Sequence, residues 1–215
     1  MRVYERMTPH PVVTGLDTPV VEAMQLISEN NFRRMPVVDK NNNLVGIITE
    51  KELQKAMPSQ ATSLSAHELN YILMKTKVGD ILPKRKLITI EADELLEEAA
   101  VLMRNHKIGA IPVTKNGALV GIITETNIFD AFIDIMGLKV PGFRITATVK
   151  GNPPGILGKI ATIISQCGGN ISHVTVRVSE KEQSAMTFRV NREADIDKIV
   201  EDLEKLSVSV IYEKV

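Results

Sequence analysis

A stretch of seven residues occurs twice in this chain, at the same spacing throughout. Leu44-Val45-Gly46-Ile47-Ile48-Thr49-Glu50 returns unchanged as Leu119-Val120-Gly121-Ile122-Ile123-Thr124-Glu125. Upstream, Met35-Pro36-Val37-Val38 corresponds to Ile111-Pro112-Val113-Thr114, with one residue lost in the turn that follows. Loops tolerate such deletions. The period is longer than the roughly 20–50 residues of stacked solenoid units. The sequence therefore predicts a duplicated domain.

Composition bounds the class of protein. The 26 Lys and Arg residues balance 26 Asp and Glu residues, so the net charge favours neither nucleic acid nor an anionic membrane. Two short basic runs, Arg33-Arg34 and Lys84-Arg85-Lys86, are typical of solvated faces. The single cysteine, Cys167, cannot form an intramolecular disulfide, and no N-terminal apolar stretch resembles a signal peptide or a spanning helix. We expect a cytoplasmic protein in which Cys167 is a buried, small apolar side chain.

Each repeat is expected to run strand, helix, strand, tight turn, strand, helix. In the first repeat a strand at Val12-Val13-Thr14 precedes a helix that Asp17-Thr18-Pro19 caps, with Pro19 as its first residue. The later strands flank the turn Asn41-Asn42-Asn43. The second repeat has the same pattern from Leu87-Ile88-Thr89 onward, and a capping box of Ser65 and Glu68 predicts a connecting helix. Neither repeat covers both faces of its sheet, so we expect the two to pack together.

The pattern changes at Phe143. A half-buried strand alternates apolar and polar residues from Phe143 to Val149, and Gly151 to Gly155 ends it. An apolar helix pattern then ends at Gly168-Gly169. Two strands, a helix capped at Asp195 and a last strand at Val208 to Tyr212 complete the order βαββαβ, which is that of a ferredoxin-like sandwich.

These motifs carry a resemblance that covers nearly the whole chain. The doubled unit resembles a tandem CBS-domain pair. The tail resembles an ACT domain at Asn152-Pro153-Pro154-Gly155-Ile156-Leu157 and Gly169-Asn170-Ile171. The order CBS–CBS–ACT is similar to that of bacterial acetoin-utilisation regulatory proteins. The expected class is α/β (α+β), with these boundaries: CBS repeat 1 at 1–57, a connector helix region at 58–75, CBS repeat 2 at 76–136, a hinge at 137–142, and a ferredoxin-like ACT domain at 143–215.

The CBS resemblance implies that the repeats bind an adenine nucleotide or adenosyl ligand: AMP, ADP, ATP or S-adenosylmethionine. The chemistry suits this, because a glycine allows close approach of the chain and a threonine hydroxyl bonds phosphate or ribose. The family's ribose-binding aspartate is replaced by Glu52 in one repeat and Asn127 in the other. The implied nucleotide-binding residues are Thr14, Pro36, Val37, Gly46, Thr49, Glu52, Thr89, Pro112, Val113, Gly121, Thr124 and Asn127. The alternative is that the glycines and threonines only turn the chain and cap helices.

The ACT resemblance implies an amino-acid site at the start of a helix, where backbone N–H groups favour a carboxylate. Its residues would be Asn152, Pro154, Gly155, Ile156, Leu157, Asn170 and Ile171. Asn152 stands where the family usually has an aspartate, so the charge that would hold a ligand's ammonium group is lost. The alternative is that this domain is only a dimerisation surface.

No catalytic or metal-ligating constellation stands out. The four histidines, His10, His67, His106 and His173, lack the spacing of a metal site. We therefore expect a regulatory sensor that is not an enzyme and requires no cofactor. It should form a homodimer and act on a regulated protein partner, without a nucleic-acid or membrane partner. The alternative is a structural or interaction module with unoccupied pockets, and an enzyme ranks below both.

Overall fold

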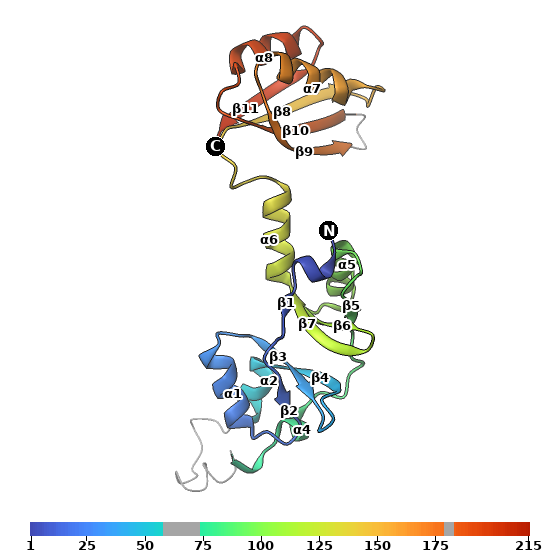
Figure 1. Cartoon of the computed structure of the whole chain (residues 1–215), viewed down its shortest axis with the longest axis vertical. Helices are drawn as coiled ribbons and strands as arrows, with labels where there is room; N and C mark the ends of the chain where they lie inside the picture. The colour runs from blue at the N-terminus through green and yellow to red at the C-terminus, as the bar shows by residue number, and fades with distance from the viewer. Residues whose placement is uncertain (58–73, 179–182) are drawn as a thin grey trace. The chain divides into compact units, whose positions relative to one another are not determined.

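The computed structural model describes residues 1–57, 74–178 and 183–215. They form two compact units, Met1–Ile128 and Phe129–Val215 (Figure 1). The first unit contains both copies of the repeated strand pair, and the second contains the ferredoxin-like tail. The predicted capping box of Ser65 and Glu68 lies outside the described residues.

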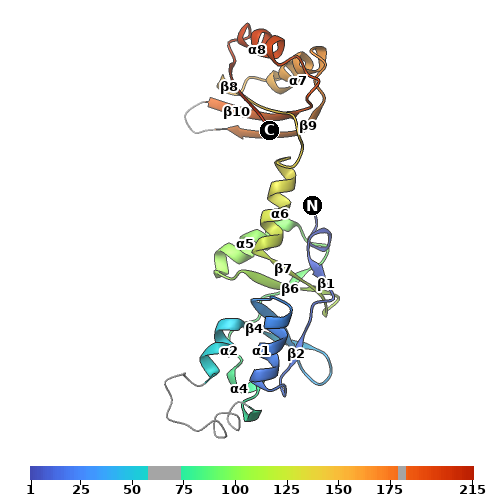
Figure 2. The same cartoon turned by 90° about the vertical axis from the view of Figure 1, so that its left-hand side faces the viewer.

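The first repeat is a three-stranded sheet with two helices. Strand β3 (Arg34–Val38) pairs antiparallel with β4 (Leu44–Thr49) and parallel with β2 (Thr14–Gly15). In the turn the Asp39 carboxylate accepts hydrogen bonds from the backbone N–H groups of Asn41 and Asn43, each at 2.8 Å. Helices α1 (Val20–Glu29) and α2 (Glu50–Ala56) pack against each other and share one apolar core with the sheet (Figure 2).

The second repeat reproduces the strand pairing of the first. Strands β5 (Ile90–Glu91), β6 (Ala110–Lys115) and β7 (Ala118–Thr124) pair as β2, β3 and β4 do. Helix α5 (Leu96–His106) lies between β5 and β6 in the sequence, and helix α6 (Glu125–Ile135) follows β7. Val37 lies opposite Gly46 and Val113 opposite Gly121, and each valine is followed by a shift of register. The duplication read from the sequence is therefore a duplication of backbone register.

The N-terminal residues do not belong to the sheet that follows them. The 3₁₀ helix η1 (Val3–Glu5) and strand β1 (Thr8–Pro9) lie on the second repeat, whose sheet has the order β1-β7-β6-β5. The backbone N–H of Val3 donates to the carbonyl of Glu94, and that of Tyr4 to the carbonyl of Ala92, both at 3.0 Å. This crossing has no counterpart in the local sequence pattern.

The reverse crossing joins the start of the second repeat to the first. Short helix α4 (Val78–Ile81) follows the connector, and the backbone N–H of Val78 donates to the carbonyl of Thr18 at 2.9 Å. The Val78 side chain is fully buried in the core formed by α1, α2, β3 and β4. The two repeats thus exchange their leading segments, with Val3 and Val78 in equivalent places.

The start of helix α1 differs from the prediction by one residue. Pro19 is the N-cap, and the helix begins at Val20, because the backbone of Pro19 is extended. Asp17 is free of the capping role and instead pairs with Lys77 at 2.9 Å and Lys40 at 3.3 Å. Hydrogen bonds from these two ammonium groups lower the pKa of the Asp17 carboxyl.

The second unit is a ferredoxin-like sandwich, as predicted. Its elements are β8 (Phe143–Lys150), α7 (Ile156–Gln166), β9 (Ile171–Val178), β10 (Gln183–Val190), α8 (Ile196–Glu204) and β11 (Ser209–Lys214). The antiparallel sheet has the order β11-β8-β10-β9, and both helices cover the same face (Figures 1 and 2). Asp195 caps α8 by accepting from the backbone N–H of Lys198.

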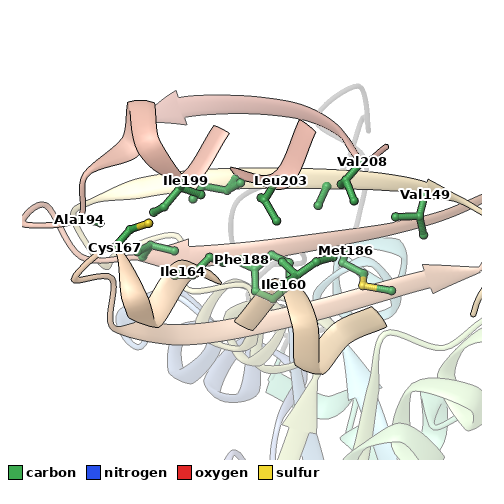
Figure 3. Packing of buried hydrophobic residues seen from close by; sticks show 13 residues of the cluster. Val149, Ile160, Ile164, Cys167, Met186, Phe188, Ala194, Ile199, Leu203 and Val208 are labelled. Carbon is green, nitrogen blue, oxygen red and sulfur yellow. The ribbon is translucent and has the colours of Figure 1, made fainter. Parts of the chain in front are cut away.

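An apolar core fills the space between this sheet and its helices. Ile160 and Ile164 of α7 and Ile199 and Leu203 of α8 pack toward Phe188 of the central strand β10 (Figure 3). Cys167 lies in this core, and burial raises the pKa of its thiol. It therefore behaves as the buried apolar side chain that the sequence predicts.

The exchange of leading segments predicts a specific pattern of destabilisation. Val3→Ala and Val78→Ala should each lower the free energy of unfolding by about 1.5–3 kcal/mol, because each removes fully buried methyl groups between repeats. Thermal and urea denaturation of the full chain would measure this. Val101→Ala, at a 45% exposed valine of α5, is the matched control and should change stability by less than about 0.5 kcal/mol. Equal effects at the three valines would contradict the exchange.

Candidate functional site

Two pockets lie where the repeats meet. The Thr124 pocket has a volume of about 460 Å³ and the Thr49 pocket about 390 Å³, both within the range of small-molecule sites. The Thr124 pocket is lined by Thr8, His10, Pro11, Val12, Asn31, Phe32, Arg33, Arg34, Pro36, Gly109, Ile122, Thr124, Glu125 and Thr126. The Thr49 pocket is lined by Arg34, Val45, Gly46, Ile47, Thr49, Pro83, Arg85, Lys86, Leu87, Ile88, His106, Lys107, Ile108, Gly109, Ala110 and Pro112.

The two pockets are built from corresponding parts of the repeats. Each takes a strand end and its threonine from one repeat, and a loop with the start of a strand from the other. Residues 10–12 in the Thr124 pocket correspond to residues 86–88 in the Thr49 pocket, and Pro36 corresponds to Pro112. Neither pocket exists within a single repeat.

The two motif threonines are helix caps. The Thr49 backbone N–H and hydroxyl both donate to Oε2 of Glu52 at 2.8 Å, and the Glu52 backbone N–H donates to the hydroxyl at 3.3 Å. In the second repeat Oδ1 of Asn127 accepts from the Thr124 backbone N–H at 2.8 Å and from its hydroxyl at 2.7 Å. Both residues three positions past the threonine thus complete capping boxes.

Glu52 also holds a cation at the Thr49 pocket. Its other oxygen, Oε1, lies 3.1 Å from Nη1 of Arg85, and Nη2 of Arg85 donates to the carbonyl of Ile47 at 3.3 Å. Both carboxylate oxygens of Glu52 are therefore engaged, so a ribose hydroxyl would compete with Thr49 or Arg85 for them. Arg85 is fixed at the rim by bonds on two sides of its guanidinium.

The pockets differ in charge although their frames correspond. The Thr49 pocket is lined by four permanent cations, Arg34, Arg85, Lys86 and Lys107, and by no carboxylate. The Thr124 pocket is lined by two arginines and by the carboxylate of Glu125. Clefts lined by charge of one sign concentrate ligands of the opposite sign. The lining of the Thr49 pocket therefore carries more positive charge than that of the Thr124 pocket.

The motif glycines make room for the exchanged segments. A Cβ on Gly46 would lie 2.9 Å from both Cδ atoms of Leu82. A Cβ on Gly121 would collide with Sδ of Met7 and lie 3.1 Å from the carbonyl oxygen of Thr8. These glycines are expected to allow close approach of the chain. In the structure, the segment that comes close to each glycine is the leading segment of the other repeat.

The residues predicted to bind nucleotide form three groups: those that line a pocket, those in the apolar core, and those in neither. Pro36 and Thr124 line one pocket, and Gly46, Thr49 and Pro112 line the other. Val37 and Val113 are fully buried core residues. Neither pocket is lined by the remaining five, which are Thr14, Glu52, Thr89, Gly121 and Asn127.

Sequence reasoning missed most of the charged lining. Arg33-Arg34 and residues 85–86 of the second basic run, read as solvated faces, line the pockets. Strand boundaries explain a second difference: β2 and β5 begin at Thr14 and Ile90, later than predicted, so Val12 and Ile88 remain outside the sheets and line the pockets. The signal that would have found these residues is their position next to the repeated strands.

The residues predicted to bind an amino acid lie in the β8–α7 loop, in the first turn of α7, and at the junction of the α7–β9 loop with β9. Gly155 is the N-cap of α7, has a φ of 78°, and provides no side-chain cap. Ile156 is half-buried against the core, while Leu157 is 40% exposed. The Asn170 backbone N–H donates to Oδ1 of Asn191 at 2.7 Å, which ties the α7–β9 loop to the end of β10.

Residues 1–57, 74–178 and 183–215 contain no group of three or more His, Cys, Asp or Glu placed to hold a metal ion. The helices in the same ranges are all too short or too polar to span a membrane.

Comparison with protein families identifies both units. The CBS domain model matches residues 3–59 and 78–134, and the AHAS small subunit-like ACT domain model matches residues 147–211. A CBS domain-containing protein of Dictyostelium discoideum is 33% identical over 135 residues, covering 62% of this chain and 92% of the relative. An inosine-5'-monophosphate dehydrogenase of Aquifex aeolicus is 29% identical over 123 residues, which cover 57% of this chain and 22% of the enzyme.

Solved structures give the same result. A Vibrio cholerae protein described as an acetoin utilization protein, AcuB, is 27% identical with a TM-score of 0.53, covering 65% of this chain and 95% of that one. CBSX2 in complex with AMP is 29% identical with a TM-score of 0.50, and the match covers 62% of this chain and 97% of that one. The CBS domain pair of protein MJ0100, in complex with 5'-methylthioadenosine and S-adenosyl-L-methionine, is 26% identical with a TM-score of 0.50, covering 61% and 95%.

The capping boxes predict that two residues expected to bind ligand also stabilise the fold. Glu52→Ala and Asn127→Ala should each lower the free energy of unfolding by about 1 kcal/mol, because each removes the acceptor for a helix-end N–H. Denaturant titration without ligand would measure it. Lys51→Ala, at an exposed position of the same helix, is the control and should be nearly neutral. Unchanged stability in both cap variants would contradict the assigned hydrogen bonds.

Proposed function

Because the chain belongs to the CBS-domain family, we propose that its repeat pair is a regulatory sensor that binds an adenine nucleotide or adenosyl ligand. One observation carries the proposal. Each pocket places a strand-end threonine and apolar strand residues of one repeat against basic and apolar residues of the other. Apolar walls suit a purine base, and arginine and lysine suit phosphate groups.

The neighbouring structures support this choice of ligand. CBSX2 binds AMP, and the MJ0100 pair binds 5'-methylthioadenosine and S-adenosyl-L-methionine. The permanent cations of the Thr49 pocket favour a ligand with phosphates, whereas the Thr124 pocket with Glu125 tolerates a ligand of lower negative charge. Occupancy of either pocket changes contacts between the repeats, and this change is the signal passed to a regulated partner. No catalytic step is included in this function.

Nucleotide binding is tested by titration and by melting. AMP, ADP, ATP and S-adenosylmethionine are added separately to the full chain in a calorimeter, and a binding ligand at about 100 times its Kd should stabilise the fold by about 2.7 kcal/mol. The double variant Thr49→Ala and Thr124→Ala should bind more weakly, since it loses both hydroxyls.

The matched control is Thr49→Ser with Thr124→Ser, which keeps both hydroxyls and both caps. Its affinity should stay close to that of the natural sequence. Absence of heat with all four ligands, together with unchanged melting, would leave the repeat pair as an interaction module with unoccupied pockets.

For the ACT-like domain we propose an amino-acid site at the start of α7. Gly155 lacks a side chain that could cap the helix, and the Ile156 backbone N–H donates to the carbonyl of Pro153 at 3.2 Å. The next N–H groups of the first turn, those of Leu157 and Gly158, would bind the carboxylate. Asn152 would accept a hydrogen bond from the ligand's amino group without a compensating charge. Leu157, exposed at 40%, would supply an apolar contact for a ligand side chain.

The same domain is proposed to form the homodimer contact. Strand β9 is at one edge of the sheet, and unpaired edges favour association. Its residues Val174 and Val176 lie opposite the buried Phe188 and Met186, yet are 42% and 48% exposed. The helical layer therefore leaves apolar surface beside this edge, and a second copy paired along β9 would cover it.

Charge placed on this edge should weaken the dimer. Val176→Glu should raise the dimer dissociation constant about tenfold or more, which corresponds to about 1.4 kcal/mol, as measured by light scattering over a dilution series. Val101→Glu introduces the same charge at a similarly exposed valine of α5 and should leave the constant unchanged. A dimer that survives Val176→Glu unaltered would exclude β9 as the contact.

A further inference from the structure

Arg34 lies where the two pockets adjoin. It lines both of them, as does Gly109. Arg34 begins strand β3 and pairs with Thr49 in the sheet register. Its side chain is thus close to one motif threonine along the sheet while also reaching the pocket of the other, Thr124.

The correspondence of the repeats fails at this position. In the second repeat the residue paired with Thr124 is Ala110. Only one of the two corresponding positions is therefore an arginine. Gly109 makes space for that arginine, because a Cβ there would collide with Nη1 of Arg34 and with Oε2 of Glu125. The first repeat thus contributes Arg34, and the second repeat contributes two small residues, Gly109 and Ala110. A single guanidinium, that of Arg34, therefore lies between the pockets.

The guanidinium of Arg34 is incompletely bonded by the protein. Its Nε is buried and has no hydrogen-bond partner. A buried N–H without an acceptor is costly, so the guanidinium gains by turning toward an acceptor, which a ligand phosphate in either pocket would supply. Arg85, by contrast, is held by Glu52 and by the carbonyl of Ile47. Arg34 is therefore a cation that can respond to occupancy, and it is the cation that lines both pockets.

We propose that Arg34 couples the two pockets negatively: a phosphate in one pocket takes up its guanidinium, so that a second phosphate-bearing ligand binds more weakly in the other. This inference rests on the proposed nucleotide binding. Arginine forms its strongest contact as a two-pronged bond to one anion. After the first phosphate has formed that bond, the second meets a neutralised arginine and a nearby negative charge.

The test needs the affinity of each pocket alone. Val12 and Val45 are 36% and 37% exposed and each lines only one pocket. Val12→Trp fills the Thr124 pocket and Val45→Trp fills the Thr49 pocket, so AMP calorimetry of each full-length variant gives one single-pocket association constant. The two-site constant of the unfilled protein, divided by the product of these two, is the coupling factor.

We expect a coupling factor of about 0.2 or lower with AMP, which is the lower end of typical coupling between sites. The same set of proteins carrying Arg34→Gln should give a factor within twofold of one. Adenosine, which has no phosphate, should also give a factor near one. Arg33→Gln removes a cation that lines only the Thr124 pocket and should keep the low factor. Melting curves confirm that each variant is folded.

Several results would overturn the inference. A coupling factor near or above one for AMP in the proteins that keep Arg34 would do so. A low coupling factor that persists in the proteins with Arg34→Gln would also do so. If the unfilled protein binds two AMP molecules without coupling, the proposed function stands and only the coupling through Arg34 is excluded. If the unfilled protein binds no AMP, both the proposed AMP binding and the coupling are excluded.

Discussion

The exchange of leading segments between the two repeats is the contact on which the rest of the first unit depends. Val78 completes the core of the first repeat, and η1 and β1 extend the second. Because each segment precedes one repeat and packs on the other, neither repeat can complete its packing alone. At Gly46 and Gly121 the exchanged segments lie so close that they leave no room for a Cβ. The pockets follow from this joint construction, since each needs both repeats.

A duplicated frame need not give two equal sites. The backbone registers of the repeats agree strand by strand, whereas the side chains at the pockets have diverged. Glu52 and Asn127 cap their helices in the same geometry, but only Glu52 carries the charge that holds Arg85. Arg34 faces both pockets and has Ala110 as its counterpart. Divergence on a common frame thus leaves two similar pockets with linings of different charge.

Features that depend on short-range pattern were predictable from the sequence. The doubled strand pair, its turn and the βαββαβ tail follow from local periodicity and are confirmed. The exchange was not predictable from local pattern, because the only sign of it is that Val3 and Val78 occupy equivalent places in the two copies. From local pattern, the basic runs at Arg33-Arg34 and Lys84-Arg85-Lys86 indicate solvent-exposed charge. In the fold, residues of each run line a pocket. The competition for Glu52 likewise arises from Arg85, which is distant in sequence.

Native mass spectrometry of the full chain, purified from the cell that produces it, tests directly whether the repeat pair is occupied by an adenosyl ligand. It needs no choice of ligand in advance. We expect a mass increment that matches an adenine nucleotide or an adenosyl compound, with at most two per chain, and its loss on mild denaturation. A chain that carries no such increment, and gains none after incubation with AMP, ATP and S-adenosylmethionine, would contradict the account.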